Sequence, residues 1–266
     1  MEYLMTYGWA ILIIAVVLGA LFQLGVFNSS SFSPRAPPGA CHVFRPSGPG
    51  TTTNINLMGV CTGQLPQYVA QFNGQTGVIT VPSSTMLQSS IFTYSAWITP
   101  ISSTTRTIIG GSANGNPQFR VEVAATLGLV KGGIVNIGTS TSAVQNNVWN
   151  FVAVTYDSYG NYVFYINGVN AGSGTNLQAF VWSNSMLIGQ RSSELFNGYI
   201  SNVQIYNTSL SANQIQALYL SGIGGAPMKL QNLAGWWPLN GNANDYSGNN
   251  NNGVPTAVTF TSQYGK

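Results

Sequence analysis

The chain opens with an unbroken apolar stretch before any alternating pattern begins. From Trp9 to Phe27 there are nineteen residues, and Gln23 is their only strongly polar side chain. At about 1.5 Å per residue, a helix of that length reaches roughly 28 Å, close to the hydrocarbon thickness of a bilayer. The pattern therefore predicts one long hydrophobic α-helix over residues 1–27.

Residues 28–50 have no helical or alternating pattern and are rich in Ser, Pro and Gly, which predicts a linker that we extend to residue 65. The two cysteines, Cys41 and Cys61, lie in this linker, and His42 is the only other metal-ligating side chain there. A disulfide is the favoured interpretation, and it would stabilise the chain by roughly 3 kcal/mol. With no acid nearby to orient it, His42 is predicted to be structural.

From Tyr68 the chain changes to short alternating runs bounded by Gly, Asn, Ser or Pro. Asn167-Gly168 is the strongest hairpin pattern, because both residues tolerate the positive φ of a type I′ turn. Runs spaced roughly ten residues apart with almost no helix between them predict a mainly β, antiparallel two-sheet sandwich or jelly roll. The predicted strands are residues 68–72, 78–81, 93–98, 107–109, 119–123, 148–156, 162–166, 186–188 and 198–206.

One helix interrupts the strands. Ser211 and Gln214 have the spacing of a capping box, and an apolar stripe of Ile215, Leu218 and Tyr219 follows. The stripe ends at Gly222, a residue typical of helix C-termini.

Charge is scarce in this chain. Only 5% of the residues are charged against a usual quarter, and the net charge of +3 comes from eight scattered basic residues. This distribution argues against a nucleic-acid partner. The uncharged polar surface agrees with an extracellular or cell-surface location, and Asn28 and Asn207 each begin a glycosylation acceptor triplet.

Acidic residues are too few and too scattered for a typical sugar hydrolase. Such enzymes need two carboxylates flanking the scissile bond, and no predicted strand carries two acids. We therefore expect a protein that is not an enzyme. The acids are Glu2, Glu122, Asp157, Glu194 and Asp245.

Residues 1–27 resemble the N-terminus of archaeal type IV pilins, with matches at Glu2, Tyr3, Tyr7, Gly8 and Trp9 in addition to the apolar composition. In that family the helix sits in the membrane before assembly and then bundles with its copies in the filament core. The resemblance implies a homo-oligomeric filament in which Gly19 and Gly25 lie at the packed helix surface. The family's basic leader and cleavage motif are not in this sequence, which indicates a processed chain or a start placed late.

The same stretch allows two other interpretations. A secretory signal peptide would have a basic n-region and a small-residue cleavage site, and neither is visible. A plain membrane anchor remains open.

The runs after Tyr68 resemble the laminin G-like domain of the concanavalin A-like superfamily, which implies a jelly roll over residues 66–222. Phe72, Trp97, Trp149 and Phe196 are then expected to be core aromatics rather than ligand platforms. The matching segments are residues 72–82, 94–100, 149–157, 165–169, 187–189 and 196–210, in the family's order.

The C-terminal segment, residues 235–266, resembles the opening of a laminin G-like unit. We therefore expect a circular permutation in which this segment completes the sandwich of residues 66–222, with residues 223–234 as the crossing linker. A truncated second copy is the alternative, although two strands alone could not hold a fold.

Asp245 is the one candidate metal ligand. Many laminin G-like domains carry calcium, and Asp245 begins an Asn-rich, Gly-containing loop that offers several oxygen atoms. One carboxylate is a low charge for Ca²⁺ and predicts weak binding. The alternative is a surface turn in which Asp245 and the Asn run form Asx hydrogen bonds.

Two functional classes follow from these resemblances. The first is a structural subunit of an archaeal type IV pilus-like filament, with the jelly roll displayed outside and able to adhere. The second is a membrane-held, lectin-like adhesin that binds a glycan or a surface protein. Glu2 separates them, because in a filament it can pair with a neighbouring subunit's N-terminal amine. An enzyme acting on surface polysaccharide is a distant third.

Overall fold

The computed structural model describes residues 13–18, 41–44, 52–55, 65–101, 104–132, 135–180 and 185–262. The chain divides into two compact units, residues 1–35 and 36–266. In the first unit, residues 13–18 are helical and all six are exposed. Among the described residues no helix has the length and apolar character needed to cross a bilayer. The residues predicted for assembly lie outside the described ones: Glu2, Tyr3, Tyr7, Gly8, Trp9, Gly19 and Gly25.

The second unit contains an eight-stranded antiparallel sheet, here called sheet I, in the order β12-β11-β10-β5-β16-β3-β19, with β17 paired to β16. Alternation of side chains turns one row of each central strand toward the second sheet of the sandwich. The strands of sheet I are β3 (Val69–Asn73), β5 (Phe92–Pro100), β10 (Asn150–Tyr156), β11 (Asn161–Ile166), β12 (Val169–Thr175), β16 (Asn197–Tyr206), β17 (Leu233–Trp237) and β19 (Val258–Thr261).

A seven-stranded sheet, sheet II, packs against sheet I in the order β18-β4-β13-β6-β7-β8-β9. The described residues of this unit also form two two-stranded hairpins, one of them in the predicted linker, and three short helical segments. Sheet II contains β4 (Val78–Val81), β6 (Arg106–Gly111), β7 (Pro117–Val121), β8 (Thr126–Lys131), β9 (Val135–Ala143), β13 (Met186–Ile188) and β18 (Val254–Thr256); the hairpin outside the linker is β14 (Gln190–Arg191) and β15 (Glu194–Leu195), and the helical segments are η2 (Thr85–Leu87), α2 (Ala212–Leu220) and η3 (Leu230–Asn232).

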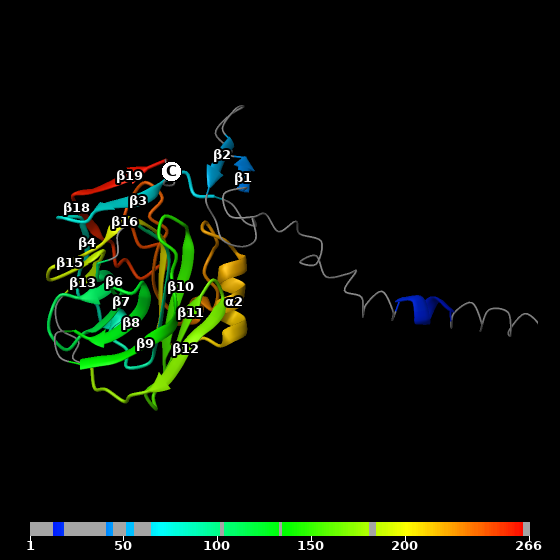
Figure 1. Ribbon diagram of the computed structural model, residues 1–266, viewed down its shortest axis with the longest axis horizontal. Coiled ribbons are helices and arrows are strands. Elements are labelled where there is room, and N and C mark those ends of the chain that lie inside the picture. Colours follow the sequence, from blue (N-terminus) through cyan, green and yellow to red (C-terminus); the bar gives the residue numbers. More distant parts are fainter. Residues whose placement is uncertain are drawn as a thin grey trace, which may run out of the picture. The chain divides into compact units, whose positions relative to one another are not determined.

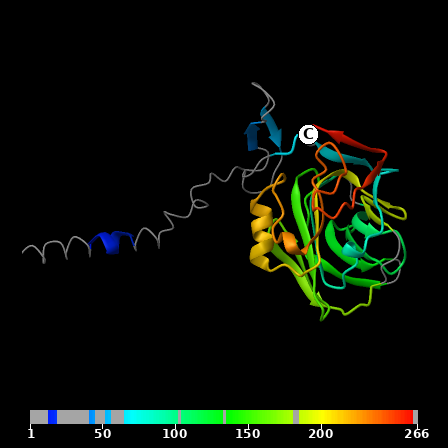
Figure 2. The same cartoon turned by 180° about the vertical axis from the view of Figure 1, so that it is seen from behind.

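Apolar side chains fill two layers. The larger cluster lies between the sheets and includes Phe72, Phe196 and Trp237. The second lies on the outer face of sheet I and joins the buried Trp97 and Trp149 to apolar side chains of α2. Figure 1 and Figure 2 show α2 on the outer side of β10, β11 and β12, with sheet II on their other side. The prediction that these aromatics belong to the core is confirmed.

The predicted fold class, a mainly β jelly-roll sandwich, is confirmed. Asn167 and Gly168 have φ of 51° and 76° and join β11 to β12, as the hairpin pattern predicts. The capping box is present, with the Ser211 backbone N–H donating to the Gln214 side chain at 2.9 Å. Several strands were not predicted, among them β8, β9 and β12, because Gly, Ser and Asn interrupt the apolar positions of these three.

The C-terminal strands lie in the same two sheets as the strands before them. β17 pairs with β16, β18 pairs with β4, and β19 pairs with β3 in the register Val258↔Phe72 to Thr261↔Val69. The indole of Trp237 is buried between the sheets and donates to the Asn251 carbonyl at 2.9 Å. The segment therefore adds to the existing sandwich and does not begin a separate sheet.

Two short strands lie within the segment that the sequence predicts as a linker. β1 (Cys41–Phe44) and β2 (Thr52–Ile55) pair antiparallel, with Cys41 opposite Ile55. The side chains of Cys41 and His42, and all of Cys61 and Asn28, lie outside the described residues.

Candidate functional site

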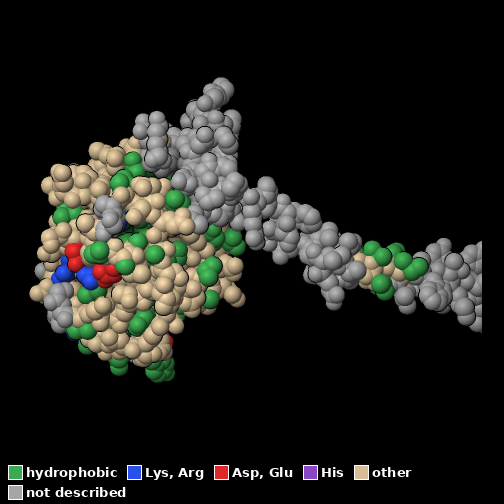
Figure 3. All heavy atoms as spheres, viewed as in Figure 1, with side chains coloured by type: hydrophobic (Ala, Val, Ile, Leu, Met, Phe, Trp, Pro, Cys, Tyr) green, Lys and Arg blue, Asp and Glu red, His purple; other side chains and the backbone are tan. Residues whose placement is uncertain are grey.

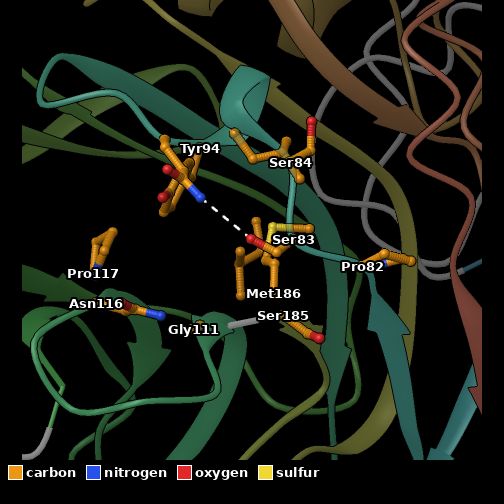
Figure 4. A pocket seen from close by; sticks show the side chains of 13 residues that line it. Pro82, Ser83, Ser84, Tyr94, Gly111, Asn116, Pro117, Ser185 and Met186 are labelled. Carbon is orange, nitrogen blue, oxygen red and sulfur yellow. Dashed lines mark hydrogen bonds between the residues drawn. The ribbon is translucent and has the colours of Figure 1, made fainter. Parts of the chain in front are cut away.

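A pocket opens at one end of the sandwich, between the β4–η2 loop, the β6–β7 turn and the start of β13 (Figure 4). Tyr94 of β5 lines it, and its hydroxyl has no hydrogen-bond partner among the described residues. Burial raises the pKa of Tyr94, so the hydroxyl stays protonated and can donate. The other lining groups are Pro82, Ser83, Ser84, Leu87, Gln88, Ile109, Gly110, Gly111, Asn116, Pro117, Ser185 and Met186.

This rim pocket is narrow. Its cavity volume is about 20 Å³, and the Gln88 side chain donates across it to Ser83 Oγ at 3.2 Å. A buried water needs at least roughly 10–15 Å³ measured in this way, so the pocket has room for one water or one ligand hydroxyl. A whole sugar ring does not fit inside it.

The outer face of sheet II carries a cluster of charged groups, and Figure 3 shows them gathered over β6, β7 and β15. Arg120 binds two acids, Glu122 at 2.7 Å through Nε and Glu194 at 2.8 Å through Nη1. The other carboxylate oxygen of Glu194 accepts from Gln118 and from Thr107. The cluster thus joins the β14–β15 hairpin to the sheet.

Glycines make room for this cluster. A Cβ on Gly128 would lie 2.4 Å from a Glu122 oxygen, and one on Gly132 would lie 2.5 Å from Arg191 Nε. Thr107 and Gln118 are fully buried although they face outward, because the hairpin lies over β6. The arrangement brings two of the chain's few acids together, but both are held by one guanidinium. These ion pairs therefore hold the β14–β15 hairpin against sheet II.

A larger hollow lies on the outer side of β16 and β17, lined by Trp236 and Asn240 together with neighbouring apolar residues. Its volume is about 120 Å³, comparable to the roughly 150 Å³ of a protein cavity that binds benzene. The hollow can therefore take one six-membered ring. Its remaining lining residues are Leu65, Pro66, Asn202, Ile223, Gly224 and Pro238.

The carboxylate of Asp245 organises the Asn-rich loop. Its oxygens accept backbone N–H groups from Trp236 at 3.0 Å, Ser247 at 2.9 Å and Asn251 at 2.9 Å, and its own N–H donates to Asn252. Three N–H dipoles point their positive ends at this carboxylate, which disfavours a cation there. The described residues hold no group of three His, Cys, Asp or Glu side chains that could bind a metal. The arrangement fits the Asx-turn alternative better than calcium.

Two other predicted positions are described. Asp157 begins the β10–β11 turn and accepts the N–H groups of Tyr159 and Asn161. Burial works against ionisation there, but hydrogen bonds from Asn161, Tyr159 and Gly160 prevail and lower the pKa of Asp157. Asn207 follows β16, and its side-chain oxygen is buried without a hydrogen-bond partner; its glycosylation stays a prediction.

The fold defines a class of protein, the two-sheet jelly roll of the lectin type. A family model for the concanavalin A-like lectin/glucanases superfamily matches residues 73–216, more than half of the chain. The chain belongs to that superfamily. The comparison with curated proteins gives no significant match.

Solved structures share the fold at low sequence identity. One is a protein from Bacteroides ovatus proposed to bind carbohydrate, with a TM-score of 0.60 and 22% identity over 75% of this chain. This chain spans 61% of the length of that protein. Another is the heptameric SAP-like pentraxin from Limulus polyphemus, with a TM-score of 0.54 and 15% identity, covering 76% of this chain and 98% of the pentraxin. At these identities the likeness concerns the fold alone.

Proposed function

We propose that this protein is a subunit of a surface filament of the archaeal type IV pilus kind, whose N-terminal helix polymerises and whose jelly roll is displayed outside as a carbohydrate-binding module. The likeness of residues 1–27 to archaeal pilins and the superfamily of the jelly roll support the two halves of this proposal. Carbohydrate recognition in related folds supports a glycan as the displayed domain's ligand.

The observation that carries the filament half is the exposed apolar helix. Its five large side chains are 49–64% exposed: Ile13, Ile14, Val16, Val17 and Leu18. Burying the exposed half of each side chain would stabilise the helix by roughly 1 kcal/mol. The five together contribute on the order of 5 kcal/mol. A helix that is apolar all round requires lipid or other helices around it. Copies of itself satisfy this requirement after the helix leaves the membrane.

The experiment is electron microscopy of material sheared from cells that express the chain, with N-terminal sequencing of the main band. Filaments whose subunits begin at or near Met1-Glu2 support the proposal. If the chain is found only in the membrane fraction and no filaments are sheared off, the alternative is favoured, a membrane-anchored lectin-like adhesin in which lipid covers the helix.

A variant pair sharpens this test. Gly19→Trp or Gly25→Trp should abolish filaments while circular dichroism of the displayed domain stays unchanged, because a large side chain prevents close approach of helices. Ile13→Val is the matched control and should assemble normally. Intact filaments from both glycine variants would contradict packing through this surface.

A further inference from the structure

We propose that the hollow beside Trp236 is a binding site for one uncharged saccharide unit. This inference rests on the proposed carbohydrate-binding function and names the site and ligand class for it. It contrasts with the rim pocket around Tyr94, whose volume admits a single hydroxyl.

The size and lining of the hollow match a sugar ring. About 120 Å³ accommodates one six-membered ring, and its walls combine Trp236, Pro238 and Ile223 with the amides of Asn202 and Asn240. A pyranose has an apolar C–H face and a polar rim of hydroxyl groups. Ligand sites of this kind are largely apolar with a few placed polar groups that fix orientation.

Trp236 is held in place before any ligand arrives. Its backbone pairs with Gln204 in β16, and its indole N–H donates to Asn202 Oδ1 at 2.8 Å. Asn202 is itself fixed, since its amide nitrogen donates to the Gly225 carbonyl at 2.8 Å. Tyr246 packs its ring edgewise on the indole at 6.2 Å. An aromatic platform that needs no reordering loses less entropy on binding.

Asn240 supplies a free donor at the mouth of the hollow. Its Oδ1 accepts the Tyr68 N–H at 2.8 Å, which orients the side chain. Its Nδ2 makes no hydrogen bond to a described residue and can donate to a ligand hydroxyl. Because Oδ1 is held by the Tyr68 N–H, the Nδ2 group has a fixed orientation in which it can bind a ligand hydroxyl.

The described residues that line the hollow are all uncharged, and this favours an uncharged ligand. None of the described residues lining the hollow is Lys, Arg, His, Asp or Glu, so a carboxylate or sulfate group would be desolvated without a partner. Sialylated and uronate-containing glycans should therefore be excluded. Neutral hexose and pentose units should be accepted.

The test is isothermal titration calorimetry on the full chain, kept soluble in a polyoxyethylene detergent, since alkyl glycosides would compete. The titrants are two panels of oligosaccharides, one neutral and one acidic. Wild type should bind at least one neutral member and no acidic one. Trp236→Leu and Asn240→Ala should each weaken that binding, the former by roughly tenfold. Tyr94→Phe is the control and should stay within about twofold.

The outcomes separate this inference from the proposed function. If Tyr94→Phe abolishes binding while Trp236→Leu and Asn240→Ala bind as wild type does, the site is wrong and the carbohydrate-binding function stands. If acidic glycans bind as tightly as neutral ones, the ligand class is wrong. If wild type binds no saccharide in either panel, the carbohydrate part of the proposed function fails together with the site. Asn240 is exposed, so its variant reports binding even if Trp236→Leu loses stability.

Discussion

Replacing Asp245 tests whether its carboxylate is an organiser of the C-terminal loop. Asp245→Ala removes the acceptor of three backbone N–H groups, those of Trp236, Ser247 and Asn251. Each N–H left without a partner in a part-buried loop costs about 1 kcal/mol, so we expect a loss of about 3 kcal/mol in the free energy of unfolding. For a chain of this size that corresponds to a fall of roughly 6–12 °C in the melting temperature.

The assay is urea denaturation of the full chain, followed by fluorescence and repeated by calorimetry. Asp245→Asn keeps one carbonyl oxygen and should lose roughly half as much stability, because its amide NH₂ then faces an N–H donor. Asp157→Ala is the matched control, since Asp157 also accepts backbone N–H groups but in an exposed turn. It should lose less than about 1 kcal/mol. Stability of Asp245→Ala within about 0.5 kcal/mol of wild type would refute the reasoning.

The same proteins decide between the turn and calcium. Millimolar Ca²⁺ should leave the melting temperature of wild type unchanged, because the carboxylate already accepts three N–H groups. If Ca²⁺ instead raises the melting temperature of wild type but not that of Asp245→Ala, the cation site is established.

Three further changes have defined outcomes in the same denaturation assay. Arg106→Met should stabilise by about 1–3 kcal/mol, because both guanidinium NH₂ groups are buried without partners. Burial lowers the pKa of Arg106 to about 10, so above pH 10 the side chain loses its buried charge and wild type should regain stability. The difference in unfolding free energy between Arg106→Met and wild type should therefore narrow there. Gly189→Ala should destabilise by more than about 3 kcal/mol, since φ is +85° and the new Cβ would lie 2.2 Å from Phe72; an unchanged midpoint would contradict this. Glu194→Gln should lose about 1–2 kcal/mol by weakening the bond to Arg120, with less loss at high salt.

Local patterns predicted those parts of the fold that local chemistry determines. The hairpin at Asn167-Gly168, the capping box at Ser211 and the alternating core strands all follow from neighbouring residues. The ends of the predicted strands lie within two residues of the observed ones, as in β5 and β6. Strands β9 and β12 were missed because they are polar edge strands of the two sheets. Tertiary contact between them stabilises both, and it includes the Thr141 hydroxyl donating to the Ala171 carbonyl at 3.0 Å.

The candidate sites could not be predicted in the same way. Arg120 and Glu194 are 74 residues apart in sequence, and nothing in either neighbourhood indicates that they pair. Trp236 lies in the segment that resembles the opening of a laminin G-like unit, and the resemblance does not distinguish it from Trp237. Trp237 is buried between the sheets, whereas Trp236 faces outward. Which of two adjacent tryptophans faces a hollow depends on strand register. The Asx-turn alternative for Asp245 was available because its donors lie within nine residues of it.

The position of β3 has a mechanical consequence. β3 is the first strand of sheet I after the linker, so tension on the linker of a displayed domain reaches the sandwich through this strand. β3 lies between two antiparallel neighbours, with β16 paired from Asn73 to Ala70 and β19 paired from Phe72 to Val69. A pull along the strand loads both hydrogen-bond ladders in shear, so many bonds must break together. β19 pairs with β3 along its whole length and so braces the loaded strand, and removing β19 should lower the force at which the domain unfolds.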